Sequence, residues 1–154
     1  MAKQKEIPGG IIQIGLGSGQ SVYGRILNHG DVAIYDFLAE DELTVFEELL
    51  KFPIIFKGVV NDSGVKRGRW QIVEVVPLEE SLKNSKYFIE EIGNPDLFKI
   101  IENGHVKYGC RKEECYGLYV GGAWAPERVE EVVRDHFSGR ENPYIKMYYA
   151  PFRS

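Results

Sequence analysis

Short runs of apolar and β-branched residues, separated by glycine-rich turns, fill most of the first hundred positions of the chain. Runs of this kind, bounded by Gly, Asn and Asp, are typical of β-strands. Tight turns at residues 17–19 and 28–31 join the first three runs, which predicts an antiparallel meander. Asn103 and Gly104 both tolerate positive φ and predict a later hairpin. The expected strands are residues 11–16, 21–27, 32–37, 54–60, 71–76, 87–92, 97–101 and 105–108.

A first helix is expected after residue 43. Thr44 and Glu47 have the spacing of a capping box, in which each side chain bonds the other residue's backbone N–H at a helix start. Phe46, Leu49 and Leu50 would share one face of this helix, and the following proline at position 53 is placed to end it.

Residues 109–137 are the most informative stretch. Residues 111–119 look helical, and Gly121-Gly122 breaks that helix. Pro126 suits the first turn of a second helix, because its missing N–H would have no partner there. An apolar stripe with helical spacing follows, and Gly139 is a plausible stop. The stripe consists of Val129, Val132, Val133, His136 and Phe137.

These elements predict an α+β fold: a curved antiparallel β-sheet, a meander that is partly barrel-like, with two or three packed helices. The length of 154 residues suggests one domain, 1–154, with residues 1–9 loosely ordered. No internal repeat, linker or low-complexity tract divides the sequence.

Charge and cysteine content narrow the function classes. A net charge of −4 argues against a general nucleic-acid binder, which would need a basic face, and suits a basic partner. Cys110 and Cys115 make no disulfide framework. On one helix they would point about 140° apart, so a reducing compartment is the simpler interpretation. The first residues carry lysines but no apolar run, which predicts neither a signal peptide nor a transmembrane segment.

The usual signatures of catalysis and cofactor binding do not emerge. Residues 15–19 are glycine-rich, but strand material follows where a nucleotide loop would open a helix. Three scattered histidines and a C-x4-C pair do not form a zinc pattern. No nucleophile elbow is present, and His136 lies beside an apolar stripe, where a half-buried histidine is commoner than a catalyst. We therefore expect no enzyme activity, no cofactor and no metal.

An acidic block runs from residue 31 to residue 48 without a lysine or arginine. One interpretation is a solvated loop with acids favourably placed near a helix N-terminus. The other is an acidic docking face for a basic protein, which would speed association and exclude wrong partners. The block consists of Asp31, Asp36, Glu40, Asp41, Glu42, Glu47 and Glu48.

A basic block, residues 66–70, ends in Arg69-Trp70. This pair could stack on a base or anchor an interface. The favoured alternative is a turn whose Trp70 packs into the sheet while its arginines pair with the acidic block. Asp36 and Arg69 could form such an ion pair.

The segments now described resemble the immunity protein 26 family of bacterial polymorphic-toxin systems. The resemblance runs from about residue 11 to the end of the chain, and the residues before it and at 17–20 look less like the family pattern. The matching pieces are Tyr23-Gly24-Arg25-Ile26-Leu27, Tyr35-Asp36-Phe37, Gly68-Arg69-Trp70 with the strand to Pro77-Leu78-Glu79, and residues 111–137.

The resemblance implies a cytoplasmic immunity protein that binds and neutralises a cognate toxin by steric and electrostatic occlusion, and a basic nuclease domain is one candidate for that toxin. It implies no membrane partner, and nucleic acid is not the expected ligand. The alternative is a small-ligand or nucleic-acid binding module that uses a sheet groove near Arg69 and Trp70. The candidate partner-binding residues are Asp36, Glu40, Asp41, Glu42, Arg69 and Trp70.

Overall fold

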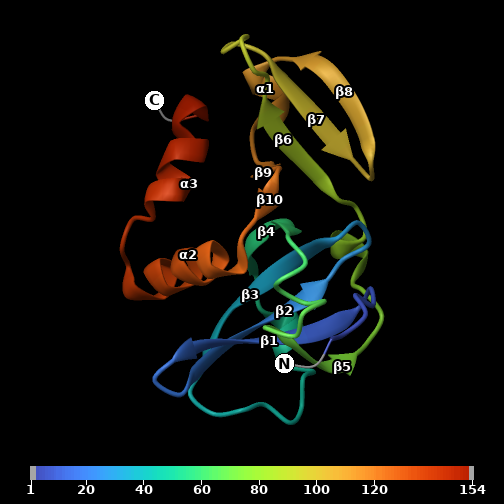
Figure 1. The fold of residues 1–154 in the computed structure, drawn as a ribbon, viewed down its shortest axis with the longest axis vertical. Helices are drawn as coiled ribbons and strands as arrows, with labels where there is room; N and C mark the ends of the chain where they lie inside the picture. The colour runs from blue at the N-terminus through green and yellow to red at the C-terminus, as the bar shows by residue number, and fades with distance from the viewer. Residues whose placement is uncertain (1–2, 153–154) are drawn as a thin grey trace.

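Two β-sheets and a group of C-terminal helices form the fold in a computed structural model that describes residues 3–152 (Figure 1). The α+β class is confirmed. The strands are β1 (Gly10–Gly17), β2 (Gln20–Ile26), β3 (Asp31–Ala39), β4 (Ile54–Val60), β5 (Gln71–Val75), β6 (Lys86–Glu90), β7 (Phe98–Glu102), β8 (His105–Cys110), β9 (Tyr119–Val120) and β10 (Ala123–Trp124). The helices are α1 (Lys112–Cys115), α2 (Pro126–Ser138) and α3 (Pro143–Tyr148), with 3₁₀ turns at Leu49–Lys51, Glu80–Leu82 and Ala150–Phe152.

The larger sheet has the strand order β10-β4-β3-β2-β1-β5. Strands β1, β2 and β3 form the predicted antiparallel meander, β4 extends it beside β3, and β10 joins β4 in parallel. Gly24 lets β2 and β3 approach, since a Cβ there would lie 2.5 Å from the carbonyl oxygen of Ala33. Gly24, the glycine of the first segment that resembles the family, is therefore explained by the close approach of two strands.

The smaller sheet has the order β8-β7-β6-β9 and lies above the larger one in Figure 1. Asn103 and Gly104 connect β7 and β8 with φ values of 49° and 86°, as the predicted hairpin turn requires. The strands therefore divide between two mixed sheets, and neither is closed into a barrel, whereas the sequence led us to expect one curved antiparallel sheet.

The segment from β9 to β10 links the two sheets. β9 pairs in parallel with β6, and β10 pairs in parallel with β4. Between them, the N–H of Gly121 donates to the carbonyl oxygen of Phe88 at 2.7 Å. A strand-like segment here replaces the end of the predicted helix over residues 111–119.

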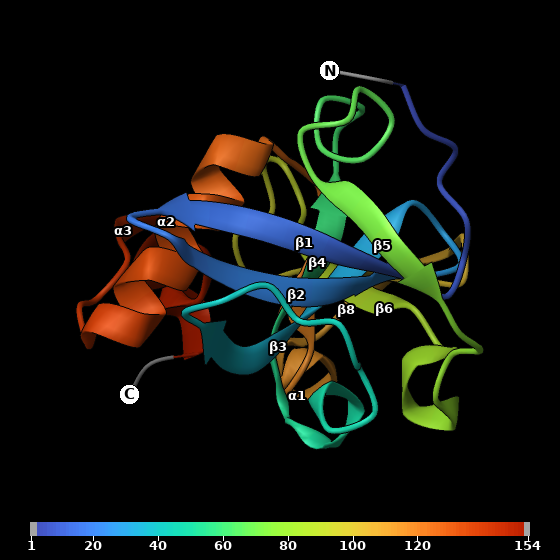
Figure 2. The same ribbon diagram turned by 90° about the horizontal axis from the view of Figure 1, so that it is seen from below.

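Helix α2 agrees with its prediction. Pro126 occupies the first turn, and Gly139 ends the helix with φ at 69°. Its buried face includes Val129 and Val133, which join the main hydrophobic core. Figure 2 shows α2 and α3 gathered on one side of the larger sheet. None of the described helices is of a length and hydrophobicity that would carry it through a lipid bilayer.

The predicted helix at Thr44 is wrong. Residues 41–48 form a loop, and only Leu49–Lys51 make a single 3₁₀ turn. Leu43 and Phe46 of this segment pack against the larger sheet: the ring of Phe46 lies 5.9 Å from that of Tyr23, whose hydroxyl accepts the N–H of Leu43 at 3.0 Å. Tertiary packing thus outweighs the capping-box signal.

Helix α1 is shorter than predicted, because Gly117, with φ at 81°, ends it after one turn. Cys110 closes strand β8 and only Cys115 lies on α1, so the two cysteines do not share a helix. Both thiols are free and buried, and burial raises the pKa of Cys115.

Two other segments differ from expectation. Helix α3 was not predicted, although Asn142 before Pro143 is a start signal: its side chain accepts the N–H of Tyr144 at 3.0 Å and of Ile145 at 3.1 Å. In the segment expected to be loosely ordered, residues 1–2 lie outside the described residues. Gln4 donates to the carbonyl oxygens of Val65 and Trp70 and accepts from the N–H of Ile72.

Candidate functional site

The guanidinium of Arg25 on β2 is fully buried. It forms an ion pair with Glu79 and donates to the hydroxyl of Tyr35 at 3.2 Å. It also donates to carbonyl oxygens of the two flanking segments, at Gly9, Val76 and Pro77. Tyr35 in turn donates to Glu79 at 2.7 Å. One guanidinium therefore ties together three segments that are distant in sequence.

These contacts assign a structural role to three of the matching positions. Burial raises the pKa of Tyr35, opposed by the hydrogen bond from Arg25, so its phenol stays protonated across the ordinary pH range. The side chain of Arg25 has no exposure to solvent. Arg25, Tyr35 and Glu79 thus act as fold determinants.

A second cluster contains both members of the basic pair around the buried carboxylate of Glu130. Trp70 is fully buried in the main core, and its Nε1–H donates to Glu130 of α2 at 2.9 Å. Arg69 forms a bidentate pair with the same carboxylate, at 2.8 and 2.9 Å, and its Nη1 lies 3.3 Å from Glu127. Glu130 thereby anchors α2 to the turn before β5.

The expected ion pairs of Arg69 need correction, whereas the favoured interpretation of Trp70 as a packed side chain is confirmed. Arg69 does not pair with Asp36 or with another member of the acidic block, because the two carboxylates of α2 occupy its guanidinium. Asp36 instead lies 3.0 Å from the Nε2 of His136. Trp70 is too buried to contact a partner or to stack on a base, which removes it from the candidate contacts and weakens the proposed binding groove beside it.

Glu130 gives the fold a testable pH dependence. Burial alone would raise its pKa, but the hydrogen bonds from Arg69 and Trp70 prevail and hold the pKa below its usual value. The folded state therefore binds fewer protons at this site than the unfolded chain. Its contribution to stability is complete above a pH of about 4.3 and is lost as pH falls through the lower pKa of the folded state.

We expect Glu130→Gln to lower the free energy of unfolding by about 1–3 kcal/mol at neutral pH, a range that allows for the 35% exposure of Arg69. The difference from the unmodified protein should shrink below a pH of about 4.3. Urea unfolding at several pH values measures it, with Glu131→Gln, an exposed neighbour, as control. A deficit independent of pH would contradict the assignment.

Asp31 differs from the rest of the acidic block because its side chain is buried. Its carboxylate accepts from Ser85 Oγ at 2.6 Å and from the hydroxyl of Tyr87 at 2.5 Å, which connects β3 to β6. Burial and the neighbouring charge of Asp31 raise the pKa of Tyr87. This aspartate holds the two sheets together and is not a surface charge.

Apart from Asp36 on β3, the remaining acidic residues lie on the loop from β3 to β4, hereafter the acidic loop, residues 40–48. Glu40, Asp41 and Glu42 are exposed, and none forms an ion pair among the described residues; Glu40 accepts one hydrogen bond, from Gln20 at 3.2 Å. Val45 is 69% exposed in the same loop. The acidic loop thus combines uncompensated negative charge with an exposed apolar side chain.

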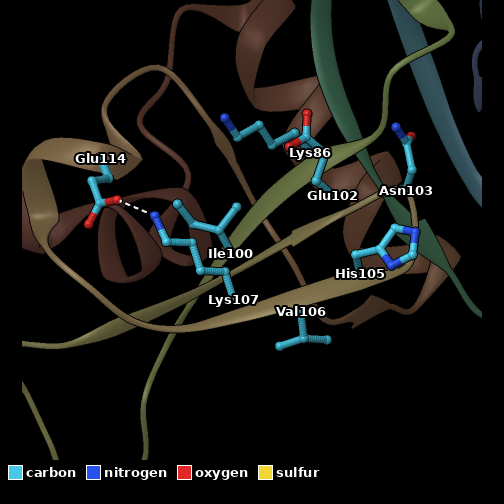
Figure 3. A pocket seen from close by; sticks show the side chains of 8 residues that line it. All are labelled: Lys86, Ile100, Glu102, Asn103, His105, Val106, Lys107 and Glu114. Atoms are coloured by element: carbon cyan, nitrogen blue, oxygen red, sulfur yellow. Dashed lines mark hydrogen bonds and ion pairs between the residues drawn. The ribbon is translucent and has the colours of Figure 1, made fainter.

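The hollow in Figure 3 has a volume of about 610 Å³ and lies over the smaller sheet and α1. Its charges are mixed. Lys107 lies 2.9 Å from Glu114, and this contact raises the pKa of the lysine and lowers that of the glutamate. Glu102 accepts from Asn84 at 3.0 Å. Both carboxylates of the hollow are therefore already bonded within the protein.

An apolar cavity of about 390 Å³ lies where Phe56 of the larger sheet meets the segment from Cys115 to Tyr119. Tyr116 is exposed at its edge and contacts the ring of Phe152 at 5.5 Å, whereas the neighbouring Trp124 is buried. Burial raises the pKa of Tyr149, which also lines this cavity, to about 12, and its hydroxyl accepts the N–H of Val120. Tyr116, unlike Trp124, is accessible as an interface anchor.

Among residues 3–152, no group of three or more His, Cys, Asp or Glu side chains is arranged to hold a metal ion. His136 is partly exposed and bonded to Asp36, and Cys110 is buried.

Together these features define an α+β protein with two mixed sheets, whose most distinctive motif residues bond one another in the interior. The family model for immunity protein 26 matches residues 7–94, more than half of the chain. The chain belongs to the immunity protein 26 family. No curated protein and no solved structure matches it.

The matched range covers all members of the Arg25 network and both Arg69 and Trp70. It includes the N-terminal residues 7–10 and 17–20, which look less like the family, and it stops before residues 111–137, to which the resemblance had extended. Glu130 and His136, the partners of Arg69 and Asp36, therefore lie outside it. Membership suggests a toxin-neutralising function with a cognate toxin as partner, and immunity proteins are generally not enzymes.

Proposed function

We propose that this protein acts in the cytoplasm and neutralises a cognate bacterial toxin by binding it and covering its active site or substrate groove. Membership of the immunity protein 26 family is the observation that carries the proposal. The mechanism is occlusion by a rigid surface, so the protein makes and breaks no covalent bond.

The acidic loop is the docking surface that we favour. Its three unpaired carboxylates, Glu40, Asp41 and Glu42, create a local negative potential that attracts a basic surface. A toxin that cleaves nucleic acid carries such a surface, because it must bind phosphates. Asp36, already bonded to His136, lies a few residues away on β3 and would contribute less.

Apolar contacts would supply the affinity that charges alone do not. Most binding energy at protein interfaces comes from a few buried side chains, while rim charges act mainly on the association rate. Val45 is exposed within the acidic loop, and Phe52, 38% exposed, follows it. We propose these two side chains as the anchors, with the carboxylates around them. Arg69, which is bonded to two carboxylates of its own chain, is a weaker candidate.

The test is co-expression with the toxin encoded beside this gene. We expect a stable one-to-one complex on size exclusion and restored growth of cells that produce the toxin. A toxin domain from an unrelated immunity pair serves as the control for specificity. If the folded protein neither co-elutes with the toxin nor restores growth, the proposed function is wrong.

A further inference from the structure

A small cavity of about 290 Å³ lies between the end of β4, the segment from Gly121 to Ala125, the first turn of α2 and the end of α3. It is far from the acidic loop in sequence and shares no lining residue with the hollow of Figure 3. A Cβ at Gly122 would meet no atom within 4 Å, so space is open on that side. The cavity is lined by Asn61, Gly121, Gly122, Ala123, Trp124, Ala125, Arg128 and Tyr148.

The lining contains donors but no carboxylate. The Oδ1 of Asn61 accepts the backbone N–H of Ser63 at 3.0 Å, which fixes the orientation of its amide. The Nδ2 of Asn61 therefore remains as a hydrogen-bond donor, and this atom bonds none of the described residues. The hydroxyl of Tyr148 likewise has no hydrogen bond among the described residues, while its ring contacts Trp124 at 5.5 Å.

Arg128 supplies the charge. Its guanidinium carbon lies 4.4 Å from the ring centroid of Tyr144, and it makes no ion pair within the described part of the chain. The adjacent Glu127 is engaged by Arg69 at 3.3 Å and does not neutralise it. An arginine stacked on an aromatic ring keeps its N–H edges available for bidentate bonding to a planar anion.

We propose that this cavity receives one aspartate or glutamate side chain from the cognate toxin, an inference that rests on the proposed function. The cavity has one positive charge, on a guanidinium, and otherwise neutral donors. It therefore matches the single negative charge of a carboxylate. A phosphate dianion would leave an excess charge on a chain whose net charge is already −4. The volume equals roughly ten water molecules, enough for a carboxylate on a short arm.

With this cavity, the protein would recognise both basic and acidic groups on its partner. The acidic loop selects basic surfaces in general, whereas the cavity requires one acid at a defined position on the partner. A partner that placed a lysine there would meet Arg128 and be rejected, which is how a binding surface gains specificity.

The experiment uses the isolated protein and propionate, which mimics a glutamate side chain, with propionamide as the neutral isostere. Titration at constant ionic strength is followed by amide and arginine Nε chemical shifts. We expect saturable shifts confined to the lining residues, namely Asn61, residues 121–125, Arg128 and Tyr148, with a dissociation constant on the order of millimolar for propionate. Propionamide should give none.

Two variants make the test sharp. Arg128→Gln should weaken propionate binding at least about tenfold, since a charged hydrogen bond is lost. Asn61→Asp keeps an acceptor for Ser63 but places a negative charge in the cavity, and it should abolish binding. Arg134→Gln is the control, because Arg134 lies on the same helix and bonds the carbonyl oxygen of Leu16.

Four results would overturn the proposal: shifts without saturation, equal binding of propionamide, tighter binding of inorganic phosphate, or propionate binding that both cavity variants retain. The experiment contains no toxin. Its failure therefore leaves the proposed function standing, and a failed toxin complex leaves the carboxylate site standing.

Discussion

Replacing Arg25 with methionine is expected to lower the free energy of unfolding by about 3–5 kcal/mol. The methionine fills much of the space but donates no hydrogen bond. It leaves the carbonyl oxygens of Val76 and Pro77, which Arg25 bonds at 2.7 and 3.0 Å, without this donor. It also leaves the carboxylate of Glu79 without its cation. Urea unfolding followed by fluorescence measures the difference.

Two further variants keep this prediction informative. Glu79→Gln retains a hydrogen-bonding side chain and should cost less, about 1–2 kcal/mol, so it reports on the network even if the methionine variant does not fold. Arg140→Met removes an exposed arginine and should stay within about 0.5 kcal/mol of the unmodified protein. If the Arg25 and Arg140 variants lose equal stability, the buried network is not a determinant of the fold.

Reversing the charges of Glu40, Asp41 and Glu42 to lysine should slow association with the cognate toxin by about 10- to 100-fold at low salt. These carboxylates form no ion pair within the described residues, so their removal changes the surface potential and not the interior. Exposed contacts of this kind steer encounter, and the dissociation rate should change less. Stopped-flow association at two ionic strengths provides the measurement, and the variant should have the shallower salt dependence.

A matched control separates local from total charge. Lysine at Glu90, Glu113 and Glu131 changes the net charge by the same amount at exposed positions outside the acidic loop. The association rate of this control with the toxin should stay closer to that of the unmodified protein than the rate of the acidic-loop variant does. Equal slowing in the two triple variants would show that total charge acts instead, and an unaltered rate in the loop variant would exclude the acidic loop as the docking surface.

Local signals predicted the elements that depend on neighbours in sequence. Asn103-Gly104 predicted a hairpin because both residues adopt positive φ at low cost, and both do so. Pro126 and Gly139 predicted the ends of α2 for equally local reasons. At Thr44 the same kind of signal failed, because aromatic contacts with Tyr23 held the segment as a loop.

The candidate site was harder to predict because its pairings are long-range. Arg69 and Glu130 are 61 positions apart, and Asp36 and His136 are 100 apart. Charge alone suggested an Asp36–Arg69 pair, and nothing in the sequence indicated that α2 would bring other partners to both residues. The cavity at Arg128 was missed for the same reason, since its lining comes from three separate stretches of the chain.

The sequence by itself determined the α+β class, the meander, the hairpin, helix α2 and the family, because each depends on residue order and local conformational preference. Only the tertiary structure decided which charges are available. Burial and pairing commit Arg25, Asp31 and Arg69 to the interior or to α2, and leave Glu40, Asp41, Glu42 and Arg128 without ion pairs within residues 3–152. A charge acts on a partner only when its own fold has not already neutralised it, and that depends on distances that the linear sequence does not contain.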